Sequence, residues 1–249
     1  MKVFIGVGHG GSDPGAVSYL VEKDVNLVEA LACRDFLETH GVQVLMSRTS
    51  DEEDPLTDEI KECNAFNPDL AVDIHNNAGG GDGFEAYYHY KGGTGKVLVQ
   101  NIEAEVKAIG QNSRGCKIRL NSGGTDYYGF IRETACPAVI VEGCFVDNAT
   151  DVQIADLLEE QKAFGVAYAK GILKTLGISI KENKAPLNPS SNAKYYVQVG
   201  ASAQKENAEK HLPTEIFLHQ KLIKVCNDCF NQNRKRSYTN GFVVHIVSP

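Results

Sequence analysis

The chain has 249 residues and a formal net charge of −7, with 42% hydrophobic and 23% charged residues. This composition is typical of one large globular domain, or of one domain with a small companion. No apolar run reaches the roughly 18–20 residues needed to cross a bilayer, so we expect no membrane insertion, and the acidic balance predicts no nucleic-acid partner.

The start of the chain lacks the pattern of a secretory signal. Lys2 is followed by a short apolar run that ends at the first glycines, whereas a signal peptide needs about 7–15 apolar residues and a cleavage site. We therefore expect a protein that is synthesised in the cytoplasm without a signal peptide. A target beyond the membrane would then require a separate release route.

Strand and helix patterns alternate along the first 178 residues. In chain order they predict a strand at 3–7, a helix at 22–41, a strand at 42–48, a helix at 54–67, strands at 70–77 and 83–90, a helix at 95–110, strands at 130–134 and 137–145, and one or two helices within 149–177. This alternation predicts an α/β fold with a mostly parallel sheet and helices on both faces.

The composition changes after residue 178. Residues 179–193 are rich in Pro, Ser, Asn and Lys and are expected to form a linker. Residues 194–249 open with a strand pattern, YYVQVGA, and a helix pattern, SAQKENAEKHL, which predict a small α+β module. Residues 181–249 hold 10 Lys+Arg against 5 Asp+Glu, a balance that would suit anionic polymers or, equally, a solvated lysine surface.

The first predicted strand leads into GVGHGG, which matches the pattern G-x-G-x-x-G. A dinucleotide site also needs a helix that begins inside the motif and an acidic residue at the end of the second strand. Here residues 12–15 predict a turn, the helix is expected to begin near Glu22, and the second strand ends at Arg48. The pattern therefore disfavours a dinucleotide site and draws attention to His9 within it.

Four ligand-type side chains are expected at one edge of the sheet. His9 and His75 lie at strand ends, Glu142 follows the buried run PAVIV, and Glu22 opens the helix after the His9 loop. Two imidazoles, one carboxylate and an open position are typical of catalytic zinc. A second carboxylate, held off the metal, could move a proton from water to a leaving nitrogen. The set predicts one Zn2+ ion and hydrolysis of an amide.

The motifs GHGGSDPGA, EKDVNL, SRTSD, DIHNNA and PAVIVEGCFVDNATD resemble, in this order, the type 3 class of zinc-dependent N-acetylmuramoyl-L-alanine amidases. The resemblance covers about residues 1–178. It implies a six-stranded, mostly parallel twisted sheet, and cleavage of the amide between N-acetylmuramic acid and the L-alanine of the peptidoglycan stem peptide. The sequence departs from the family pattern at Gly143-Cys144, which look exchanged, so the local backbone geometry is in question.

The resemblance also implies roles for individual residues. It makes His9, Glu22 and His75 the zinc ligands and Glu142 the catalytic acid/base. Asn77 is expected to help hold the substrate or the loop.

Three further features have competing interpretations. Arg48 and Asp51 are expected to brace the sheet edge by ionic contacts. The glycine-rich loop 121–129 either lines a substrate groove or forms an exposed turn. Cys144 lies close to Glu142, but no base stands beside it in sequence to activate a thiol nucleophile.

The segment YYVQVGASAQKENAEKHL resembles a SPOR-type repeat, a module that binds glycan strands without stem peptides. The expected partners are therefore bacterial peptidoglycan and, through residues 194–249, denuded glycan or anionic wall polymers. The expected setting is a phage or prophage endolysin that acts on the cell wall after holin-dependent release. The alternatives are a host autolysin with the same activity, or a cell-wall-binding protein whose catalytic site is dispensable.

Overall fold

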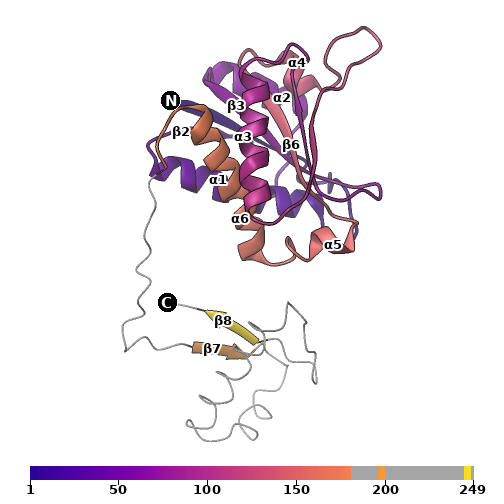
Figure 1. The fold of residues 1–249 in the computed structure, drawn as a ribbon, viewed down its shortest axis with the longest axis vertical. Coiled ribbons are helices and arrows are strands. Elements are labelled where there is room, and N and C mark those ends of the chain that lie inside the picture. Colours follow the sequence, from indigo (N-terminus) through magenta and orange to yellow (C-terminus); the bar gives the residue numbers. More distant parts are fainter. Residues whose placement is uncertain (181–195, 200–243, 248–249) are drawn as a thin grey trace, which may run out of the picture. The chain divides into compact units, whose positions relative to one another are not determined.

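The computed structural model describes residues 1–180, 196–199 and 244–247 (Figure 1). The chain divides into two compact units, Met1–Glu182 and Asn183–Pro249. In the second unit, β7 (Tyr196–Val199) and β8 (Val244–Val247) form an antiparallel pair. The predicted linker beyond residue 180, and the helix expected after β7, lie outside the described residues, and the predicted domain boundaries stay a prediction.

The first unit is built on a six-stranded sheet. Its strands are β1 (Lys2–Val7), β2 (Gln43–Met46), β3 (Leu70–Asn77), β4 (Phe84–Tyr88), β5 (Ser113–Lys117) and β6 (Ala138–Phe145). They lie in the order β2-β1-β3-β6-β4-β5, and neighbours run parallel except for β4 and β6. The predicted mostly parallel six-stranded sheet is therefore confirmed.

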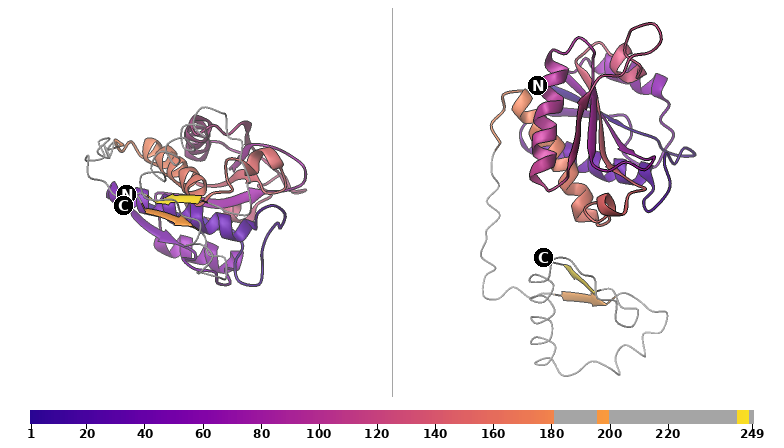
Figure 2. Two further views of the ribbon diagram at one scale, coloured as in Figure 1. Left: turned by 90° about the horizontal axis from the view of Figure 1, so that it is seen from below. Right: turned by 45° about the vertical axis from the view of Figure 1, so that its right-hand side comes forward.

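Helices cover both faces of this sheet (Figures 1 and 2). The larger core lies on the face covered by α1 (Glu22–Thr39), α3 (Thr94–Ala108) and α6 (Leu158–Thr175). A smaller core lies under α2 (Leu56–Phe66) and α4 (Gly129–Glu133), and the short helix α5 (Ala149–Val152) follows β6. None of the helices in the described residues has both the length and the apolar character to span a bilayer.

Two elements differ from the prediction. Residues 130–134, predicted as a strand, lie mostly in α4, whose Phe130 and Ile131 are buried in the smaller core. A run this short fits either period, so its packing decides its conformation. The strand β5 has no counterpart in the prediction, because SRGCK lacks apolar alternation and lies at the sheet edge, where pairing with β4 supplies its order.

The three central strands bring their carboxyl ends to the same edge. Because β1, β3 and β6 run parallel, side chains that follow β1 or stand near the ends of β3 and β6 lie close together. Along β1, Val3 and Ile5 face the larger core and Phe4 the smaller one, as the alternation of a strand requires.

Helix α6 approaches α1 closely at Gly165. A Cβ atom there would clash with the backbone oxygen of Glu29 and lie 2.9 Å from the Cβ of Ala32, both in α1. The glycine therefore sets the spacing between the two helices, and with it the position of the first turn of α1.

Replacing Gly165 with alanine tests this packing. Alanine favours a helix by roughly 0.8–1 kcal/mol over glycine, but overpacking costs about 1–3 kcal/mol, and the backbone of α1 cannot rotate away. We expect Gly165→Ala to lower the free energy of unfolding, measured by denaturant titration. The control is Lys162→Ala on the exposed side of α6, and an unchanged midpoint for Gly165→Ala would contradict the proposed spacing.

Candidate metal centre

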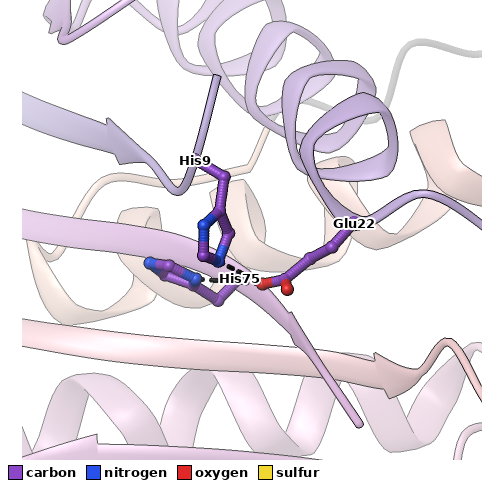
Figure 3. A group of neighbouring side chains, drawn as sticks. All are labelled: His9, Glu22 and His75. Carbon is purple, nitrogen blue, oxygen red and sulfur yellow. Dashed lines mark hydrogen bonds and ion pairs between the residues drawn. The ribbon is translucent and has the colours of Figure 1, made fainter. Parts of the chain in front are cut away.

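Three side chains converge where the loop after β1, the first residue of α1 and the end of β3 meet (Figure 3). The carboxylate atom Glu22 Oε1 lies 3.2 Å from His9 Nε2 and 3.1 Å from His75 Nδ1. The imidazole rings stand nearly perpendicular, at 83°, with centroids 5.0 Å apart. All three ligand atoms lie within 4.8 Å of one another, so two nitrogens and one oxygen could hold a single metal ion.

The glycine loop presents His9 through tight local packing. His9 has a φ of 63°, in the left-handed region that non-glycine residues seldom adopt. A Cβ atom at Gly8 would clash with the ring of His75, so this glycine makes room for the second imidazole. Asn26 Nδ2 donates to the Gly8 carbonyl at 2.9 Å and anchors the loop to α1. The glycines therefore create space for side chains.

Arg48 holds the same loop from the other side. It is buried and donates to the carbonyl oxygens of Val7 at 3.1 Å, Gly8 at 3.2 Å and Lys23 at 2.8 Å. Asp51 instead pairs with Lys23 Nζ at 2.8 Å. The expectation of ionic contacts is thus right for Asp51 and wrong for Arg48, which satisfies backbone acceptors at the end of the strand.

Each imidazole has a second carboxylate behind it. His9 Nδ1 lies 2.8 Å from Asp13 Oδ2, and His75 Nε2 lies 3.3 Å from Asp73 Oδ2. Such contacts orient metal-binding histidines and select the tautomer, leaving the other nitrogen to face the metal. Burial alone would raise the pKa of Glu22, but hydrogen bonds from the two imidazoles outweigh it and hold that pKa well below its ordinary value. The third ligand therefore stays a carboxylate.

Glu142 stands beside the three ligands without belonging to the group. It is the register partner of His75 on the neighbouring strand and lines the same cleft. Burial raises the pKa of Glu142 to about 7, opposed by His75 and reinforced by the carboxylates of Glu22 and Asp73. A carboxyl group poised near neutrality is suited to accept and return a proton.

Residues 3–174 match the family described as N-acetylmuramoyl-L-alanine amidase. The chain belongs to this family. It is 36% identical to the amidase CwlM of Bacillus licheniformis over 214 residues, which cover 84% of this chain and 78% of CwlM. It is 32% identical to the endolysin of Bacillus phage SPP1 over 189 residues, covering 72% and 67% of the two chains.

Solved structures share the fold. Cwp6 from Clostridium difficile superimposes with a TM-score of 0.69 at 36% identity, over 70% of this chain and 29% of Cwp6. The catalytic domain of CwlV, an N-acetylmuramoyl-L-alanine amidase from Bacillus (Paenibacillus) polymyxa, gives a TM-score of 0.64 at 27% identity, over 72% and 99% of the two chains. The α/β unit is therefore an amidase catalytic domain in its fold.

The amidase cleft has a volume of about 640 Å3 and contains all the sequence-predicted site residues. Its walls come from the residues before α2 and α4, including Pro55 and Tyr128. The last residues of the loop 121–129, Tyr128 and Gly129, therefore line the groove. Asn77 also lines the cleft, but its Oδ1 accepts from the Ala78 backbone at 2.8 Å and its Nδ2 donates to Glu85 at 3.4 Å. These contacts fit the loop-holding role, and its substrate role stays a prediction.

Sequence reasoning missed the residue that supports the site from below. Asn76 is buried, and its backbone N–H donates to Glu22 Oε1 at 3.3 Å. Its side chain bonds to Asn26 at 3.0 Å and Glu29 at 3.3 Å and accepts from the Cys144 backbone at 2.9 Å. The sequence did hold a signal for this role, because Asn76 is a polar residue at a position where β3 is expected to face the larger core.

The Gly143-Cys144 departure coincides with an irregularity of β6. The register between β3 and β6 shifts between His75 and Asn77, and a Cβ atom at Gly143 would clash with the hydroxyl of Tyr168. Burial raises the pKa of the Cys144 thiol well above its ordinary value, which argues against a thiolate nucleophile. Packing therefore explains why Gly143 and Cys144 stand in this order.

The contact between Asp13 and His9 predicts an effect on metal affinity. Asp13→Asn removes the negative charge that orients the imidazole, and loss of such a partner typically costs 10–100-fold in affinity. We expect at least a tenfold weaker site in a competition titration with a chelator. Asp35→Asn, an exposed change on α1, is the control. Equal affinity in Asp13→Asn and the parent would show that Asp13 does not support the ligand.

Proposed function

We propose that this chain is a zinc-dependent peptidoglycan hydrolase that cleaves the amide between N-acetylmuramic acid and the L-alanine of the stem peptide. The observation that carries the proposal is the approach of His9 Nε2 and His75 Nδ1 to one oxygen of Glu22, with Glu142 on the same cleft. Membership of the amidase family supports the bond that is cut.

The donor set fits zinc. Two imidazole nitrogens and one carboxylate leave a fourth position open, as catalytic zinc sites require, whereas Mg2+ and Ca2+ prefer sites made of oxygen ligands alone. When bound, zinc polarises the scissile carbonyl and lowers the pKa of a coordinated water to roughly 7. His9, Glu22 and His75 would hold this one ion, and Asp13 and Asp73 would fix the orientation of the two imidazoles.

Glu142 would carry the proton. As a carboxylate it accepts a proton from the attacking water, and as the acid it then returns that proton to the nitrogen of L-alanine as the amide bond breaks. Its pKa of about 7 suits both steps near neutral pH. Because Glu142 and His75 are register partners on adjacent strands, the sheet itself sets their separation.

Two substitutions separate metal binding from proton transfer. Glu142→Gln is expected to retain zinc and to lose at least 10²–10⁴-fold in kcat, the usual contribution of general acid–base catalysis. His75→Ala is expected to lose both zinc and activity. Metal analysis and turnover of each purified variant give the answer, and an active Glu142→Gln enzyme would exclude this mechanism.

The products of digestion test the bond and the metal together. Purified peptidoglycan treated with the full chain should yield, by mass spectrometry, stem peptides with free L-alanine N-termini and intact glycan strands. A chelator should abolish their release, and added zinc should restore it. New amino groups without free L-alanine would indicate a different peptidase, and sedimentation with walls without any product would indicate a pure binding protein.

The biological setting and the second unit extend this proposal. We infer a phage or prophage endolysin released through a holin, and a gene adjacent to a holin gene would support that setting. A host autolysin is the second candidate, favoured by 35% identity to the sporulation-specific amidase of Bacillus subtilis over 84% of this chain. Residues 194–249 would bind denuded glycan or anionic wall polymers, and the 214-residue alignment to CwlM extends beyond residues 3–174.

A further inference from the structure

Two buried carboxylates of the cleft each have an oxygen atom with no role in the chemistry described above. Glu59 of α2 is 5% exposed and Asp73 of β3 is 3% exposed, and both line the cleft. Within the described part of the chain, Glu59 Oε1 and Asp73 Oδ1 have no hydrogen-bond partner. Buried polar atoms are seldom left without one, and of the five such side-chain atoms in the described residues only these two belong to residues that line the cleft.

The two free oxygens lie over the same point of β1. A Cβ atom at Gly6 would clash with Glu59 Oε1 and would lie 2.8 Å from Asp73 Oδ1. The other oxygen of Asp73 is occupied by His75 Nε2 at 3.3 Å. The pair therefore adjoins the metal centre, on the side of the His75 ring that faces away from Glu22.

The surroundings of the pair call for a positive charge. Asp54 and Glu53 line the same cleft, and in residues 1–180 no lysine or arginine pairs with Glu59 or Asp73. Burial, followed by the charge of Asp73, raises the pKa of Glu59 well above its ordinary value. The raised pKa favours the neutral form of Glu59, and a cation between the two oxygens would offset this by pairing with both carboxylates.

An ammonium group fits this position better than a second metal ion. Among the described residues, three ligand atoms come within 4.8 Å of one another only at His9, Glu22 and His75. Hard divalent cations need about six oxygen ligands, whereas an ammonium group has three N–H donors that a pair of carboxylates can accept. Stem peptides carry a diamino acid whose side chain ends in such a group.

We propose that Glu59 and Asp73 form an ammonium-binding subsite that recognises the side-chain amine of the stem peptide's diamino acid. This inference rests on the proposed function, because the amine must reach the cleft on the peptide whose first amide bond is cut. The subsite would make the amidase select stem peptides with a free amine over those in which the amine is blocked.

The test compares two soluble muropeptides that differ only by N-acetylation of that amine. The zinc-loaded full chain should cleave the free-amine substrate with a kcat/KM roughly tenfold higher or more, mainly through KM, because a hydrogen bond to a charged group is worth about 1.5–3 kcal/mol. In Glu59→Gln this ratio should fall toward one. Glu62→Gln, an exposed change on the same helix, should keep the parental ratio.

Glu59→Gln is preferred to any change at Asp73, because Asp73 also contacts His75. The variant replaces a buried carboxyl group beside Asp73 with a neutral amide of the same size and should melt no lower than the parent. Metal analysis after equilibration with zinc and calcium should give one equivalent in both proteins.

The outcomes separate the subsite from the main activity. Equal kcat/KM values for the two muropeptides in the parent chain would overturn the subsite and leave the amidase intact. A second metal equivalent that is lost in Glu59→Gln would replace the ammonium group with a metal ion. If neither muropeptide is cleaved with zinc present, the proposed function fails and the subsite falls with it.

Discussion

A single carboxylate oxygen joins the three elements that make the site. Glu22 Oε1 contacts His9 from the loop after β1, His75 from β3 and the backbone N–H of Asn76. Glu22 can do this only because α1 begins at that residue, and the axis of α1 is set by its contact with α6 at Gly165. The packing of α1 against α6 therefore helps to position Glu22 in the metal centre.

A buried polar network below the site keeps this arrangement in place. Glu29 accepts hydrogen bonds from Asn76 and from the hydroxyl of Tyr168 at 3.2 Å, linking α1, β3 and α6. Burial raises the pKa of Glu29 to about 8, so at neutral pH it is mostly uncharged. The network therefore adds specific hydrogen bonds without placing a full charge in the larger core, where an unpaired one would be costly.

The positions of the four main site residues could be predicted because each stands at a strand end or in a first helical turn. His9, His75 and Glu142 share one sheet edge for reasons of parallel topology, and their roles came from the family resemblance. The juxtaposition of Asp73 with Glu59 could not be predicted, because Glu59 comes from a helix elsewhere in the chain. Local patterns likewise failed for β5 and for residues 130–134, where pairing and packing decide the conformation.

Along β3, successive side chains point alternately into the larger core and into the cleft. Val72 and Ile74 enter the larger core, while Asp73 and His75 line the cleft. A one-residue slip would exchange the two sets, so the apolar packing that fixes the register also fixes the ligand. The facing positions are Gly6 on β1 and Gly8 just after it, whose missing side chains leave space for the Glu59–Asp73 pair and for the ring of His75. The glycines that mimic a phosphate-binding motif are therefore better explained as the complement of polar side chains on the adjacent strand.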